Sequence, residues 1–166
     1  MKLLLKEKVF SFRETFHVLD ENGMPVYDVT GKAFSWGHQL TVSDRSGAEL
    51  ARIGQKLFSL TPRYEIDTAG GIPSDLRGHL TFLRPRYTLQ TEGGDWEIHG
   101  NFLEHEYQMI RGNETVASVR KQWFTWGDTY LLEVPRESDA MTALAVMIAI
   151  DCIDSDTAAA ASSAST

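Results

Sequence analysis

The sequence AMTALAVMIAIDCI, residues 140–153, is the only long apolar stretch in the chain. At about 1.5 Å of rise per residue it forms a helix of roughly 20 Å, which is shorter than the helix of about 20 apolar residues that crosses a bilayer. A helix without a polar face has to be enclosed by other parts of the protein. The residues before it have the alternating pattern of short β-strands. We therefore predict a mainly β protein, a barrel closed around its own C-terminal helix.

Length and composition are those of one globular domain. The chain has 166 residues, 42% hydrophobic and 23% charged, which is enough for a substantial core. Its net charge of −7 argues against nucleic acid as a partner, because a polyanion attracts proteins with excess positive charge. The single cysteine, Cys152, excludes an intrachain disulfide and a cysteine-based zinc site. Its place in the apolar stretch predicts a buried, inert thiol.

The N-terminal sequence MKLLLKEKVFSF has only the beginning of a signal peptide. Its apolar segment stops at Leu5, whereas a secretory signal needs an apolar core of about 7–15 residues. We therefore predict a cytoplasmic protein without a transmembrane segment, and peripheral attachment to a membrane stays open. The glycine pairs at 70–71 and 93–94 lack the spacing of a phosphate-binding loop, and no cofactor is predicted. The oligomeric state is not indicated.

Alternating apolar and polar residues, separated by turn signals such as Asn22-Gly23, predict an antiparallel meander. Pro85 and the Gly70–Pro73 segment interrupt it as turns or edges. The predicted strands number about twelve, at residues 9–20, 26–29, 34–43, 49–55, 57–60, 64–67, 79–83, 87–91, 96–101, 107–111, 115–121 and 129–134.

Positions 66 residues apart carry matching residue types, which indicates a duplicated meander. Two such copies favour the pseudo-symmetric halves of one closed sheet, which leaves no exposed edge. The matched residues are Ala51, Ile53, Leu57, Phe58, Ser59, Leu60 and Tyr64 in the first half and Ala117, Val119, Trp123, Phe124, Thr125, Trp126 and Tyr130 in the second.

The ends of the helix define the predicted domain. The helix is expected after Pro135, with Ser138 or Asp139 as its N-cap. Asp151 interrupts the apolar stretch and needs either a strand Arg or Lys beside it or a place at the mouth of the barrel, since an unpaired buried carboxylate is costly. We predict a barrel domain at residues 1–154 and a disordered, Ala/Ser-rich tail at residues 155–166.

Six stretches carry a resemblance to a known family: LLLKEKVFSF, DENGMPVYDVTGKAFSWGHQL, ELARIGQKLFSLTPRYEI, LTFLRPRY, VASVRKQWFTWGDTYLLEV and ALAVMIAIDCI. Together they span nearly all of residues 2–153 and resemble the LURP-one-related proteins, a part of the tubby-like superfamily that also includes the phospholipid scramblases. The resemblance implies a twelve-stranded barrel around a central C-terminal helix. It implies no enzymatic activity, and the tubby relatives are phosphoinositide-binding modules.

A group of arginines is the first candidate site. Arg84 and Arg86 are predicted to share a strand face, and Arg77 and Arg63 are expected nearby across neighbouring strands. Guanidinium groups held on adjacent strands can bind a phosphate headgroup in a bidentate manner. The alternative interpretation is a set of solvated arginines interleaved with acids.

Histidine and carboxylate residues form the second candidate. Histidine and carboxylate side chains can bind zinc or transfer protons. In a strand, however, His105 would point away from Glu104 and Glu106, and His99 with Glu97 makes only a pair. No metal site and no catalytic residue is therefore predicted.

Aromatic residues are the third candidate. They could stack on nucleobases, but their recurrence at repeat positions favours packing inside the barrel wall. These residues are Trp36, Tyr64, Trp96, Trp123, Phe124, Trp126 and Tyr130.

The sequence thus predicts a binding or scaffold module rather than an enzyme. One hypothesis is a phospholipid headgroup on the outer barrel wall, bound by Arg63, Arg77, Arg84 and Arg86. The alternative is a protein partner without a lipid ligand. A small metal-dependent or hydrolytic enzyme is the remote alternative, and it would require Glu97, His99 and another acid to converge.

Overall fold

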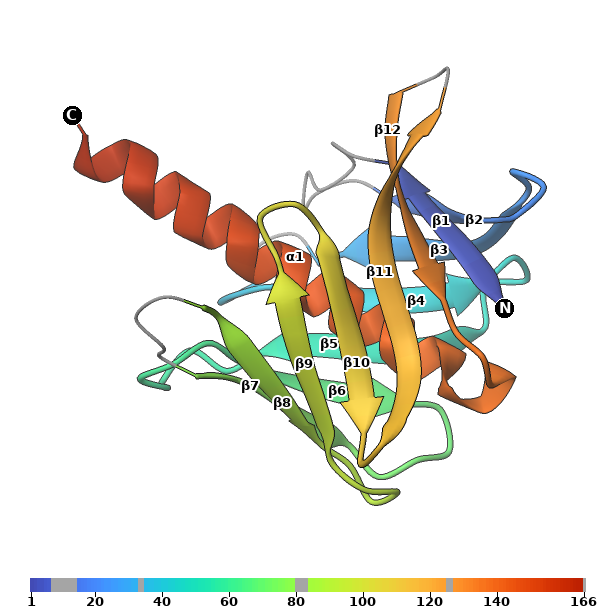
Figure 1. Ribbon diagram of the computed structural model, residues 1–166, viewed down its shortest axis with the longest axis horizontal. Coiled ribbons are helices and arrows are strands. Elements are labelled where there is room, and N and C mark those ends of the chain that lie inside the picture. Colours follow the sequence, from blue (N-terminus) through green and yellow to red (C-terminus); the bar gives the residue numbers. More distant parts are fainter. Residues whose placement is uncertain (7–14, 33–34, 80–83, 125–126, 166) are drawn as a thin grey trace.

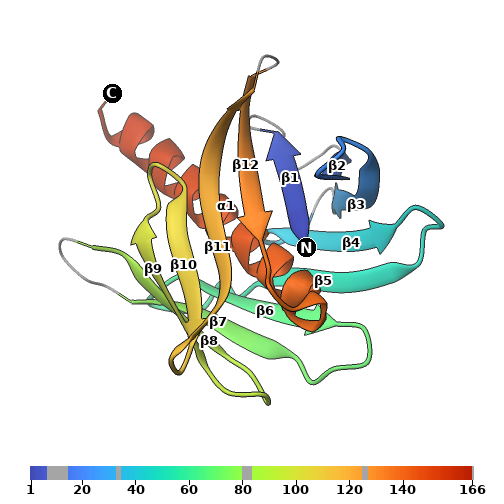
Figure 2. The same ribbon diagram turned by 45° about the vertical axis from the view of Figure 1, so that its right-hand side comes forward.

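The computed structural model describes residues 1–6, 15–32, 35–79, 84–124 and 127–165. Within these ranges it contains twelve β-strands followed by one α-helix. The strands form a closed antiparallel barrel, and the helix runs through it (Figures 1 and 2). The predicted fold, a barrel closed around a C-terminal helix, is confirmed.

Each strand pairs with its neighbours in the sequence, and β1 closes the ring by pairing with β12. In this closing pair Leu3 lies opposite Leu132, and Leu5 lies opposite Tyr130. The strands are β1 (Lys2–Lys6), β2 (Phe16–Asp20), β3 (Pro25–Gly31), β4 (Gln39–Asp44), β5 (Glu49–Gln55), β6 (Arg63–Thr68), β7 (Ser74–His79), β8 (Arg86–Gln90), β9 (Trp96–Asn101), β10 (Glu106–Arg111), β11 (Glu114–Phe124) and β12 (Gly127–Glu133).

The core lies between the barrel wall and the helix. Alternate residues of each strand point inward; in β6, for example, Tyr64 and Ile66 are buried and Glu65 is exposed. The helix α1 (Glu137–Ala164) is buried on all sides from Ala143 to Ile150. This section contains Ala143, Ala145 and Ala149, and their small side chains let the strands pack closely around the helix. One core cluster therefore joins the whole barrel.

The first turn of α1 is held by an ion pair instead of the expected N-cap. Arg136 occupies the N-cap position and makes no capping hydrogen bond with its side chain, so the prediction of Ser138 or Asp139 as the cap was wrong. The Asp139 carboxylate instead accepts two hydrogen bonds from Arg111 at the end of β10, each 3.0 Å long. The helix start is thus tied to the barrel wall.

The far end of α1 differs from the predicted disordered tail. The helix continues to Ala164, although the residues from Asp156 onward are exposed and touch no core. Figure 1 shows this end projecting beyond the strands. No helix of the described residues combines the length and the apolar character needed to span a membrane.

The structure differs from the local predictions where an apolar pattern has a different cause. Lys2–Lys6 was not predicted as a strand, but it forms β1, with Leu3 and Leu5 in the core. Leu57–Leu60 was predicted as a strand and is instead part of the connection between β5 and β6. Trp36 was assigned to the core, and its side chain is exposed. Tyr64, Trp96 and Tyr130 are buried as expected, whereas the side chains of Trp123, Phe124 and Trp126 lie outside the described set.

The two ends of the barrel are chemically distinct. Because the strands are antiparallel, the connections after β3, β5 and β9 lie at one end. The C-terminal part of α1 leaves the barrel there: Asp156 bonds to His38 before β4, and Asp151 lies beside His105 before β10. We call this end the helix-exit mouth and the other end the opposite mouth.

Candidate binding surface

Arg63 and Arg77 form the centre of the candidate surface. They are direct cross-strand partners of β6 and β7. Asp75, two residues before Arg77 on the same face of β7, accepts a hydrogen bond of 2.7 Å from Nε of Arg63 and one of 2.6 Å from Nε of Arg77. The two guanidinium groups are thus held side by side on the outer wall.

The electrostatics of Asp75 show that the arginines dominate its surroundings. Partial burial alone would raise the pKa of this carboxyl group, but the hydrogen bonds from Arg63 and Arg77 outweigh burial and lower it. Asp75 therefore stays ionised and holds both arginines in place. The hydrogen bonds to Asp75 come from Nε of each arginine.

Arg86 extends this surface by one strand. It opens β8 opposite His79, and the next outward residue of β8, Thr88, is the direct partner of Arg77. Arg86 therefore lies diagonally across from Arg77 on the same wall, within reach of a long side chain. Arg84 precedes Pro85 and lies outside β8, so the predicted shared strand face of Arg84 and Arg86 is wrong.

The surface adjoins the helix-exit mouth. Arg63 and Arg86 are the first residues of their strands, and Lys56 precedes Arg63 across the β5–β6 connection. Lys56 Nζ lies 3.0 Å from Glu65 Oε2, and both side chains are about half exposed. The arginines and Lys56 thus form a positively charged edge with interspersed acids. Such an edge can place several donors on one phosphate group.

The second candidate does not assemble. Glu97 and His99 are exposed on the outer face of β9, whereas His105 turns inward, with its Nδ1 3.8 Å from Asp151 Oδ1. Glu104 accepts a hydrogen bond of 2.7 Å from Asn101. Among the residues that the structure describes, no three His, Cys, Asp or Glu side chains gather as a metal site.

The interior of the helix-exit mouth holds a polar cluster that the sequence only partly indicated. The His105 ring stacks on Tyr130 with centroids 4.1 Å apart and faces Asp151, which is the mouth location considered for this residue. Burial raises the pKa of Asp154 to about 7. Cys152 is buried as expected, and burial raises the pKa of its thiol, so the thiol stays protonated.

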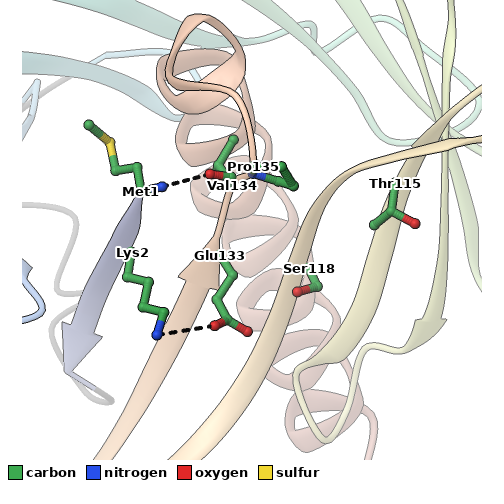
Figure 3. Close-up of a pocket in the computed structure, with 7 residues that line it drawn as sticks. All are labelled: Met1, Lys2, Thr115, Ser118, Glu133, Val134 and Pro135. Carbon is green, nitrogen blue, oxygen red and sulfur yellow. Dashed lines mark hydrogen bonds and ion pairs between the residues drawn. The ribbon is translucent and has the colours of Figure 1, made fainter.

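A hollow of about 370 Å³ lies far from these groups, at the opposite mouth (Figure 3). The charged groups in it are already paired: the N-terminal amine donates to the Val134 carbonyl at 2.7 Å, and Lys2 Nζ lies 3.7 Å from Glu133 Oε1. It is an open depression on the outside of β11, β12 and β1. Its chemistry offers less to a ligand than the arginine edge does.

Comparison with known proteins places the chain in a family. It matches the family described as LURP-one-related over residues 1–151. A relative from Bacillus subtilis (strain 168), described as uncharacterized protein YxjI, is 37% identical over 153 residues and is matched over 92% of this chain and 93% of its own length.

A crystal structure of an Arabidopsis thaliana protein shares the fold. It superposes with a TM-score of 0.57 at 15% identity and covers 90% of this chain and 89% of its own. At this identity the likeness supports the architecture alone. The family match and the bacterial relative decide the classification: the chain belongs to the LURP-one-related family.

Proposed function

We propose that the protein is a non-enzymatic binding module that recognises anionic phospholipid headgroups through Arg63, Arg77, Arg84 and Arg86. The observation that carries this proposal is the pairing of Arg63 and Arg77 across β6 and β7, where Nε of each arginine donates to Asp75. Arginine is suited to phosphate because its planar fork can donate two parallel hydrogen bonds.

The location of the surface supports this proposal. The helix and the core side chains fill the barrel, so a ligand binds on the outer wall or at a mouth and not inside. The arginine edge is on the outer wall, where a headgroup can approach without displacing the core. A cytoplasmic protein would meet such headgroups on the inner leaflet, whose anionic lipids attract basic side chains by about 1 kcal/mol each.

Co-sedimentation with lipid vesicles tests the proposal. The vesicles contain phosphatidylcholine alone or with phosphatidylserine or a phosphoinositide, at low and at near-physiological salt. We expect binding to the anionic vesicles, and a loss of about tenfold or more in the Arg84→Ala, Arg86→Ala and the Arg63→Gln, Arg77→Gln double variants. The matched control is Arg45→Gln, Arg136→Gln, which removes the same charge at the opposite mouth.

Two further arms define the ligand. A soluble inositol phosphate that competes with the vesicles would identify the phosphate headgroup as the recognised chemistry. Asp75→Asn, which releases both arginines from their carboxylate, should strengthen binding, whereas the equal charge change Glu21→Gln should not. Equal losses in the arginine variants and in the control, or no binding at low salt, would overturn the proposal and leave a protein partner as the better account.

A further inference from the structure

Exposed apolar side chains are gathered around the helix-exit mouth. We define this apolar rim as Trp36, Leu57, Phe58, Leu60 and Leu103. Trp36 and Leu103 are each 89% exposed, and Leu60 is 100% exposed. Burying such side chains in the protein would have been favourable, and their exposure on projecting connections marks an interaction surface.

The rim comes from three connections that the barrel brings to one end. Trp36 precedes β4, Leu57 to Leu60 follow β5, and Leu103 follows β9. The first two touch: a Cβ atom added at Gly37 would lie 2.9 Å from Leu57 Cδ2. The backbone nitrogen of Gln55 also donates to the His38 carbonyl at 2.9 Å. The rim is therefore a feature of the fold and not a set of unrelated loop residues.

Basic residues accompany the rim. Lys32 lies in the same connection as Trp36, and Lys56 precedes Leu57. Arg84 lies shortly before β8, and Arg86 is the first residue of that strand. The opposite mouth differs: it also exposes Met24 and Ile72, but its turns carry the acids Glu21, Glu92 and Asp95. Although the chain has a net charge of −7, the helix-exit mouth thus combines exposed apolar side chains with these basic residues, whereas the turns of the opposite mouth carry acids beside Arg45 and Arg136.

Three carboxylates of α1 lie at the same mouth, and two of them face histidines of the barrel. Asp156 bonds to His38 at 2.9 Å, and Asp151 lies beside His105. Asp154 is partly buried, and burial raises its pKa to about 7, which keeps a large fraction of it neutral near pH 7. Beyond Asp156 the helix carries no charged side chain through Ser165. The helix beyond Asp156 therefore adds no negative charge to the rim, and Asp151 and Asp156 each face a histidine.

We propose that the helix-exit mouth is a membrane-docking face, in which the apolar rim enters the interfacial layer of an anionic bilayer while the neighbouring lysines and arginines contact headgroup phosphates. This proposal rests on the headgroup binding proposed above and adds the orientation and the inserted residues. A bilayer fits the rim better than a folded partner does, because apolar side chains that project from three connections suit a fluid layer of acyl chains and headgroups. The adjacent basic side chains complement an anionic leaflet.

A fluorescent label tests the orientation. Cys152 is buried, so a cysteine introduced on the surface can be labelled selectively. Leu60→Cys places an environment-sensitive nitrobenzoxadiazole dye on the rim, and Ala48→Cys places it at the opposite mouth. With vesicles of phosphatidylcholine and phosphatidylserine we expect a blue shift at position 60 and none at position 48. Equal responses at both positions, or none at position 60 in protein that co-sediments, would overturn the docking face.

A pair of matched variants separates this inference from headgroup binding. Phe58→Ser, Leu60→Ser should lower the affinity for anionic vesicles about tenfold, since two apolar side chains no longer insert. Met24→Ser, Ile72→Ser removes two exposed apolar side chains from the opposite mouth and should change nothing. Neither variant should alter competition by a soluble inositol phosphate at the arginine edge.

The possible failures differ from one another. Rim variants that bind vesicles like the wild type, while the arginine variants lose binding, would refute the docking face and preserve headgroup binding. Loss in the rim variants alone, with the arginine variants unchanged, would support insertion and refute the arginine site. A wild-type protein that binds no vesicle refutes both proposals, and the rim would then mark a protein interface.

Discussion

Arg111 at the end of β10 and Asp139 in the first turn of α1 are joined by two parallel hydrogen bonds of 3.0 Å. Asp139 is buried, and the hydrogen bonds that Arg111 donates to its carboxylate are the main reason why the pKa of Arg111 is raised. No side chain caps the N-terminus of the helix. The pair of Arg111 and Asp139 instead fixes the start of the helix to the barrel wall at the opposite mouth.

Arg111→Gln should lower the free energy of unfolding by about 2 kcal/mol, because it leaves the Asp139 carboxylate without its charged partner. Arg120→Gln is the control, since Arg120 pairs with Glu133 in an exposed position and should cost less than about 1 kcal/mol. Urea titrations of the wild type and both variants give the comparison. A cost at Arg111 no larger than that at Arg120 would contradict a fixing role for the pair.

The raised pKa of Asp154 should make the stability of the protein depend on pH. Its pKa is raised by burial from 3.8 to about 7 in the folded protein. Between these two values the folded state holds a proton that the unfolded state has lost, so this group makes the protein less stable as pH rises from about 4 to 7. The penalty is complete above pH 7 and absent below the unfolded value.

Asp154→Asn should therefore raise the free energy of unfolding at pH 8 by on the order of 1–2 kcal/mol, after allowance for partial solvation of the carboxyl group. The melting temperature should rise by a few degrees at pH 8 and change little at pH 4. Thermal unfolding of the wild type and the variant at pH 4, 6 and 8 measures this. Asp95→Asn, in the exposed turn before β9, is the control and should show no such trend. A stabilisation that is equal at all three pH values would argue against a protonated Asp154.

The architecture could be predicted from the sequence because the segment from Ala140 to Ile153 leaves few alternatives. A short helix that is apolar on every face needs an enclosing sheet, and the alternating strands before it provide one. Periodicity could not distinguish an apolar residue in the core from one on a projecting connection. For this reason Leu57–Leu60 was predicted as a strand and Trp36 as core.

The candidate surface was only partly predictable for a related reason. The nearness of Arg63 and Arg77 depends on the register of β6 and β7, which the turn between them sets. The carboxylate that holds them, Asp75, has no sequence signal of its own. The proposed duplication stays a prediction, although Ala51 and Ala117 occupy inward positions of β5 and β11, and Tyr64 and Tyr130 those of β6 and β12.

Gly100 occupies a backbone position that other residues cannot adopt without strain. It lies in β9 opposite Tyr107 with φ of +152°, and an added Cβ would overlap the Glu106 carbonyl oxygen and the Tyr107 Cα atom. Both obstacles are backbone atoms, so no side chain can move aside. Gly100→Ala should cost about 3 kcal/mol or more, or abolish soluble expression.

Gly93 provides the matched control for this substitution. A Cβ atom added there has Thr91 Oγ1 as its nearest neighbour, at 3.8 Å, which is ordinary van der Waals contact. Gly93→Ala should therefore remain within about 0.5 kcal/mol of the wild type in urea titration. If Gly100→Ala were equally well tolerated, the close approach of β9 and β10 at this position would be disproved.

The C-terminal helix has two parts that should respond differently to truncation. Its section from Ala140 to Ile153 fills the barrel, and removing it would leave a cavity too large to collapse, so that variant should not fold. The section after Asp156 packs against no strand, and a short isolated helix is marginally stable in water.

We propose that residues 1–156, which keep the bond between His38 and Asp156, are a complete folding unit. Ending the chain after Asp156 should change the melting temperature by less than about 2 °C, and amide exchange in the full chain should be fast from Thr157 onward. A large loss of stability on this truncation, or slow exchange in the tail, would show instead that the projecting turns are held by contacts with another part of the chain.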